Sequence, residues 1–173
     1  MTDTSTVAGG RPPSTSTTYN PFAGASFPPG TPVRQDLHHD DTVLPGRADS
    51  IETTILTGIA VGAGVEGWGS RSNNRVHVQY IGPLTLPIQQ WSEITDNPRG
   101  LIRGVPYFLS ATDDGKLTID PPTDSGTFVA PVGVALSATT LFILLSFPSV
   151  RIIFGKDSSA PTASASMSSS NAE

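Results

Sequence analysis

The sequence of 173 residues contains no cysteine, and it has only 10 Lys and Arg residues against 15 Asp and Glu. Without cysteine the chain can form neither disulfide bonds nor thiolate metal sites, which fits assembly in a reducing cytosol. The net charge of −5 and the scattered basic residues argue against a nucleic-acid-binding protein, because affinity for phosphates comes mostly from clustered Lys and Arg. The N-terminus lacks the charged start and apolar run of a secretory signal, so we expect a chain that is not secreted.

One uncharged stretch, Phe128 to Val150, is about as long as a helix that crosses a bilayer. Pro131, Gly133 and Pro148 interrupt it, and β-branched and aromatic residues dominate the remainder. This composition favours two strands joined at residues 137–139 over a membrane helix, and we expect no membrane partner.

The two ends of the chain are poor in large apolar residues. Residues 1–32 contain eleven Ser or Thr and six Pro, and residues 156–173 contain seven Ser and four Ala. Such segments cannot bury enough apolar area to offset the entropy that ordering costs them. The sequence therefore predicts an extended arm over residues 1–32, a single β-domain over 33–155 and a disordered tail over 156–173.

Several patterns inside residues 33–155 predict short elements. Alternation around Ile51 and Ile55, followed by residues 59–61, predicts a strand, a bend at Gly58 and a second strand. Further strands are expected at residues 75–82, 105–110 and 116–120, and Asp113-Asp114-Gly115 predicts a hairpin turn between the last two. We expect Val76, Val78 and Tyr80 to share the buried face of the first of these, and Ile88, Trp91 and Ile94 to share one face of a helical turn after Pro87.

The final strands carry the pattern with the largest consequence for function. Val132, Val134 and Leu136 are expected to share one face of a strand over residues 128–136. In the next strand Leu141, Ile143, Leu145 and Phe147 occupy one face, and Phe142 and Leu144 occupy the other. A small sheet has one interior, so the second apolar face needs a cover, which is either a second sheet layer of the same chain or an identical subunit. Closed assembly is the usual way to cover such a face, and we predict that Phe142 and Leu144 form a subunit interface.

No set of residues predicts catalysis, a cofactor or a metal ion. Residues 62–67 spell G-x-G-x-x-G, but the following residues cannot form the helix that a dinucleotide site requires. Residues 124–127 resemble the Asp-Ser-Gly-Thr signature of aspartic proteases, yet prolines rather than an apolar strand precede them. His38 and His39 lie among acidic residues that could bind a divalent cation, but neighbouring side chains of an extended segment point to opposite sides, so both histidines cannot easily bind one ion. His77 lies on the polar face of its strand and is expected to be exposed or hydrogen-bonded rather than to act as a base. An enzyme is the least supported class.

Trp68 lies in a loop rich in Gly, Ser and Asn. A large aromatic side chain there either packs on a neighbour or is presented to a ligand, so Trp68 is predicted as an exposed contact.

Taken together, the strand over Gly104 to Leu109, the Gly-Lys-Leu-Thr strand, the Pro-Pro spacer and the Val-Gly-Val-Ala-Leu-Ser strand resemble the small all-β domains of tailed-bacteriophage virion proteins, above all the capsid decoration (cement) proteins. The resemblance covers roughly residues 40–154. It implies an all-β fold, a single small β-barrel or β-sandwich with one short helical turn. It also implies a structural protein on the virion surface that is assembled in the host cytoplasm, binds the major capsid protein and forms a homotrimer.

In that reading the arm lies across capsid subunits and is anchored by its scattered apolar residues, Tyr19, Phe22, Phe27 and Val33. A head-fibre or tail-fibre receptor-binding module is the alternative, because the same pattern of strands occurs in fibre proteins. Long fibres usually show repeats or a coiled-coil stalk, and this chain has neither.

Overall fold

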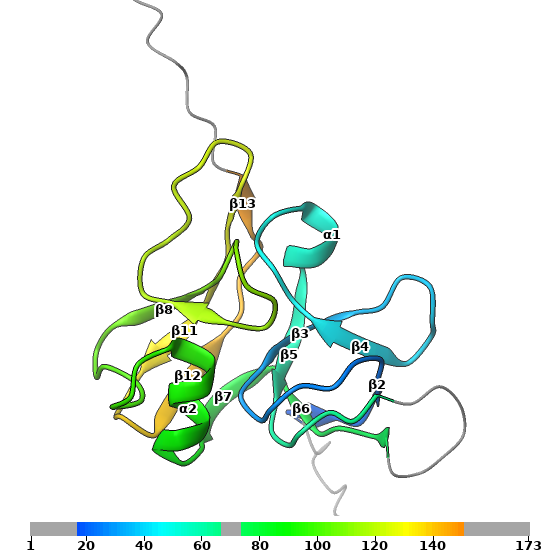
Figure 1. Ribbon diagram of the computed structural model, residues 1–173, viewed down its shortest axis with the longest axis horizontal. Coiled ribbons are helices and arrows are strands. Elements are labelled where there is room, and N and C mark those ends of the chain that lie inside the picture. The colour runs from blue at the N-terminus through cyan, green and yellow to red at the C-terminus, as the bar shows by residue number, and fades with distance from the viewer. Residues whose placement is uncertain (1–16, 67–73, 151–173) are drawn as a thin grey trace, which may run out of the picture.

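The computed structural model describes residues 17–66 and 74–150, and it confirms the expected all-β class (Figure 1). A six-stranded sheet has the order β1-β6-β5-β3-β4-β2, and a five-stranded sheet has the order β7-β12-β11-β8-β9. The strands of the first are β1 (Thr18–Tyr19), β2 (Phe22–Ala23), β3 (Pro32–Gln35), β4 (Thr42–Pro45), β5 (Leu56–Ala60) and β6 (Val78–Gln79). Those of the second are β7 (Ile81–Thr85), β8 (Pro106–Leu109), β9 (Leu117–Thr118), β11 (Pro131–Ala135) and β12 (Thr140–Leu144).

Three smaller elements complete the described chain. A two-stranded sheet pairs β10 (Phe128–Val129) with β13 (Ser149–Val150). The helices are α1 (Ile51–Thr54) and α2 (Ile88–Thr95), and neither is long and apolar enough to cross a membrane.

The six-stranded sheet is strongly curled. Its outermost strands, β1 and β2, are only three residue steps apart in the chain, a span of at most about 11 Å. Six strands in a flat sheet would place the outermost two about 24 Å apart. The sheet must therefore bend round until its edges meet, and two contacts mark the closure: Phe22 forms a bridge with Arg75, and the Val76 N–H donates to the Pro21 carbonyl at 2.9 Å.

Two clusters of buried side chains form the core. The smaller cluster lies within the curled sheet and contains Ala23, Phe27, Val33, Val43, Ala60, Val76 and Val78. The larger one gathers the inward side chains of the five-stranded sheet with Trp91 and Ile94 of α2. Strand β5 connects the two, because Ile59 packs in the larger cluster and Ala60 in the smaller.

Helix α2 confirms the predicted helical turn. Trp91 and Ile94 are buried, and the Trp91 indole N–H donates to the Thr139 carbonyl at 2.8 Å. The helix ends at Asp96, whose positive φ of 54° stops it. Ile88 is partly exposed at the start of the same face.

The hairpin at Asp113-Asp114-Gly115 is confirmed as well, with β8 paired antiparallel to β9 and Gly115 at a φ of 69°.

The predicted arm is corrected over half of its length. Residues 17–32 were expected to lie outside the domain, but β1 and β2 form both edges of the six-stranded sheet. Phe27 and Val33 are buried in the smaller cluster. Two of the four predicted anchors therefore belong to the domain's own core. Residues 1–16 and the expected tail over 156–173 lie outside the described residues.

Two further expectations were wrong in detail. Residues 51–54 form α1 instead of a strand, because Ser50 and Thr53 make a capping box in which the Ser50 Oγ accepts from the Thr53 N–H at 3.3 Å. Tyr80 was expected beside the buried Val76 and Val78, but it falls at the break between β6 and β7 and is exposed.

A β-bulge changes the expected faces of β11. The register to β8 shifts between Pro131 and Gly133, so that Val132 and Gly133 are both buried in succession. Beyond the bulge Ala135 points inward, and Val134 and Leu136 point outward. The outward pair was expected to share the face of Val132.

Candidate interaction surface

The outward-facing side chains of the five-stranded sheet form an apolar surface, which we call the outer face. Strand pairing arranges them in rows across the strands. The rows are Pro106, Val134, Phe142 and Pro83; then Ile81 and Leu144; and then Leu136, Thr140 and Thr85. Ile81, Val134, Leu136, Phe142 and Leu144 are between 39% and 57% exposed. None of the residues in these rows carries a charge.

The polar side chains of the outer face bind each other. The hydroxyls of Thr85 and Thr140 lie 3.0 Å apart on neighbouring strands and form a hydrogen bond. This bond gives each hydroxyl one partner, which lowers the cost of covering the row with another apolar surface.

The edge of the sheet beside the outer face is blocked. The Leu86 N–H donates to the Thr139 carbonyl, so alternate residues of β7 bond to β12 and the nitrogen of Pro83 faces the open edge. Proline offers no N–H there. The Gln79 side-chain amide donates to the carbonyls of Ile81 at 3.0 Å and Pro83 at 3.1 Å. Another strand therefore cannot extend the sheet at β7 through a regular ladder, and the face is the part left open.

A groove of about 630 Å³ continues the outer face toward the six-stranded sheet. We call it the seam groove, and its lining residues are Tyr19, Gln35, Leu56, Thr57, Tyr80, Ile81, Leu144 and Leu145. Burial raises the pKa of Tyr19, an effect that the neighbouring Thr57 side chain partly offsets. Next to the groove, Phe147 is 92% exposed. The groove and the outer face share Ile81 and Leu144, so they make one continuous apolar surface.

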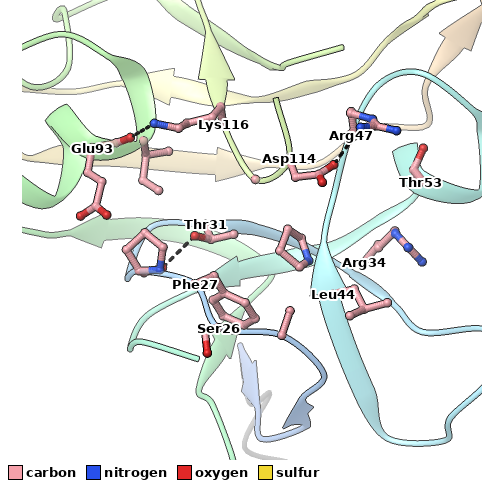
Figure 2. Close-up of a pocket in the computed structure, with 15 residues that line it drawn as sticks. Ser26, Phe27, Thr31, Arg34, Leu44, Arg47, Thr53, Glu93, Asp114 and Lys116 are labelled. Carbon is pink, nitrogen blue, oxygen red and sulfur yellow. Dashed lines mark hydrogen bonds and ion pairs between the residues drawn. The ribbon is translucent and has the colours of Figure 1, made fainter. Parts of the chain in front are cut away.

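A second hollow has a different character. This cleft of about 550 Å³ lies among β3, β4, α2 and the β8–β9 turn, and its lining includes Arg34, Arg47, Asp114 and Lys116 (Figure 2). Most of these charges are paired: Arg47 binds Asp49 at 2.5 Å and Asp114 at 3.5 Å, and Lys116 binds Asp96 at 2.9 Å.

The ion pair between Arg47 and Asp49 lowers the pKa of this aspartate. The hydrogen bond from Arg47, supported by one from Thr53, holds the pKa of Asp49 below its usual range. The Lys116 ammonium also donates to the Glu93 carbonyl of α2 (Figure 2). These contacts tie the β8–β9 turn to α2 and to the segment after β4, so the cleft is held together from within.

The predicted arm anchors have separate positions. Phe27 and Val33 are 6% and 0% exposed, so they cannot contact another protein in this conformation, and that part of the prediction is corrected. Tyr19 lines the seam groove. Phe22 is half-buried on the closing edge of the curled sheet, where the Arg75 guanidinium stacks 4.2 Å from the centre of its ring. Trp68 lies outside the described residues.

The predicted interface residues Phe142 and Leu144 both lie on the outer face. Sequence analysis missed their neighbours Val134, Leu136 and Ile81. The apolar character of these residues was visible, but the bulge in β11 and the pairing of β12 with β7 decide which way they point.

The other candidate motifs do not form a site in the described residues. His39 lies 2.8 Å from Asp36, but no group of three or more His, Cys, Asp or Glu residues there is arranged to hold a metal ion. Burial alone would raise the pKa of Asp36, but the His38 N–H and the His39 ring lower it below its usual range. Gly64 of the glycine motif pairs with Phe27, and the Asp124 carbonyl accepts from the Thr127 hydroxyl in a local turn.

Comparison with protein families, curated proteins and solved structures finds no match to this chain.

Proposed function

We propose that this protein is a structural virion protein, a capsid decoration protein that binds the outside of a bacteriophage head and stabilises it by bridging subunits of the major capsid protein. In this proposal it acts as a homotrimer, needs no cofactor and performs no catalysis. The observation that carries the proposal is the continuous apolar surface made by the outer face and the seam groove. Exposed apolar surfaces of this extent mark sites of protein association.

The fold supports the same function. The edges of the six-stranded sheet are joined by residues 20–22, and Pro83 and Gln79 block one edge of the five-stranded sheet. A domain built in this way can expose an apolar face without pairing its edges with other chains at random. That combination suits a protein that must attach in one orientation at many equivalent positions.

Heads that lack the protein provide the direct test of the function. Purified full-length chain should bind such heads at hundreds of copies per particle and raise the temperature at which they release DNA. Quantitative gel analysis of sedimented heads gives the copy number. Binding of only a few copies would favour the alternative receptor-binding fibre module, and no binding would overturn the proposal.

The arm can be tested with a shorter deletion than the sequence alone suggested. Removing residues 1–32 would also remove β1, β2 and Phe27 from the domain, so loss of binding could reflect unfolding. Deletion of residues 2–16 leaves both strands in place. If the polar arm contacts the capsid, this deletion should lower head occupancy without changing thermal unfolding of the free protein, and unchanged occupancy would contradict the role of the arm.

A further inference from the structure

We infer that the outer face and the seam groove bind a second copy of this chain. The inference deepens the proposed function by naming the partner of its apolar surface. Self-association does not require a capsid, so it can be tested on the purified protein alone.

The distribution of charge favours a second copy as the occupant. The chain carries a net charge of −5, yet no residue in the rows of the outer face is charged. Two copies that meet through this face therefore bring no like charges into direct contact, although the chain as a whole is acidic. A charged partner would gain no ion pair here and would lose the hydration of its own charges.

The size of the surface also fits an interface between copies. The five large hydrophobic side chains of the outer face expose on the order of 400 Å² together, which is the size of the largest patch on a typical monomer, and such patches are often functional. A stable interface takes about 800 Å² from each partner. The prolines and threonines between these side chains, the seam groove and the nearly fully exposed Phe147 supply further area next to the same face.

The geometry restricts how the second copy can approach. Pro83 and the Gln79 amide prevent strand addition along β7, so a second copy that covers this surface meets it face to face. The Thr85–Thr140 hydrogen bond gives both hydroxyls of the face one partner when water leaves. Phe147 projects beside the seam groove, so a neighbouring copy can receive this side chain between Tyr80, Leu56 and Leu145.

The test is sedimentation velocity of the full-length protein over a range of concentrations. The wild type should sediment as an oligomer, and Leu144→Glu should weaken association at least tenfold, because it would bury an unpaired carboxylate in each copy. Leu37→Glu is the matched control: Leu37 is 64% exposed against 57% for Leu144, and it lies in the β3–β4 loop, far from β11 and β12 (Figure 1). The control should sediment like the wild type.

Phe142→Ser provides a second variant if Leu144→Glu fails to fold, with circular dichroism as the check on folding. Its association should also be weakened at least tenfold. A wild-type protein that remains monomeric at high concentration would overturn the inference, and so would equal association of wild type and the folded outer-face variants. If these variants lost head binding while the wild type was a monomer, the face would instead meet the capsid, and the capsid-binding role would stand without the homotrimer and without this inference.

Discussion

The two faces of the five-stranded sheet have similar composition and different surroundings. On the inner face Leu84, Tyr107, Leu109, Leu141 and Ile143 are at most 4% exposed, because α2 and β5 pack over them. On the outer face, side chains of the same kinds are 39–57% exposed. Composition therefore does not decide which face belongs to the core. The element that lies over a face decides it, and within the described residues no helix or strand packs over the outer face.

The largest difference between the faces should appear in a pair of neighbouring substitutions. Ile143→Ala leaves a cavity in the larger core cluster and should lower the free energy of unfolding by about 2–5 kcal/mol. Leu144→Ala removes a side chain that is already largely in water and should change the stability of the monomer by less than about 0.5 kcal/mol. Urea denaturation at a concentration where the protein is monomeric measures both. Equal losses would mean that the outer face is covered within one chain.

A smaller loss of stability is expected at Gly133, where the backbones of β11 and β12 approach closely. A methyl group on Gly133 would come within 2.3 Å of the Phe142 carbonyl oxygen, so Gly133→Ala should push β11 and β12 apart and cost about 1–3 kcal/mol. Gly62→Ala is the control, because nothing lies within 4 Å of the added methyl group there. Thermal denaturation compares the two variants. If Gly133→Ala were as stable as the control, close approach of these strands would not be needed for the fold.

The smallest effects concern pH and salt, which should act on folding and on association differently. The pKa of Asp36 and that of Asp49 are lowered in the folded protein, so their ionised forms stabilise it above the unfolded pKa of about 3.9, and this contribution is lost as the pH falls through the lower folded values. Stability should therefore fall in acid below about pH 4, and Asp36→Asn should reduce the dependence on pH.

The constant for association through the outer face should depend little on pH, because the rows of this face contain no titratable group. The association constant should stay within about twofold between pH 5 and 8 and should not weaken as salt is raised, since salt screens charges but not apolar contact. Sedimentation across these conditions checks both statements. A constant that fell steeply with salt would show that ion pairs hold the copies together.

The elements predicted correctly are those whose signals are local. Trp91 and Ile94 share a helical face because they are three residues apart, and the hairpin at residues 113–115 follows from the positive φ that Gly115 accepts. The two apolar faces of β12 are visible in alternating residues. Helix α1 replaces the predicted strand because the Ser50–Thr53 capping box favours a helical turn at residues where the alternation of Ile51 and Ile55 indicates a strand.

The candidate surface was only half predictable for the same reason. Phe142 and Leu144 follow from the period of one strand, and their neighbours require knowledge of how strands pair. Residues 17–32 are the clearest case of a failure caused by missing long-range information. Their Ser, Thr and Pro content is that of a disordered segment, yet Phe27 is buried against Gly64, where any larger residue would collide with its ring.

The amino-acid order is enough to specify an all-β chain with a short helix and a strand that is apolar on both sides, because these features arise from the spacing of neighbouring residues. The fold in three dimensions sets which side of that strand stays open, where the edges of the curled sheet meet and how residues 17–32 join the core. Those outcomes depend on contacts between residues far apart in the chain, such as Phe27 with Gly64 and Pro83 with Phe142, and periodicity carries no information about them.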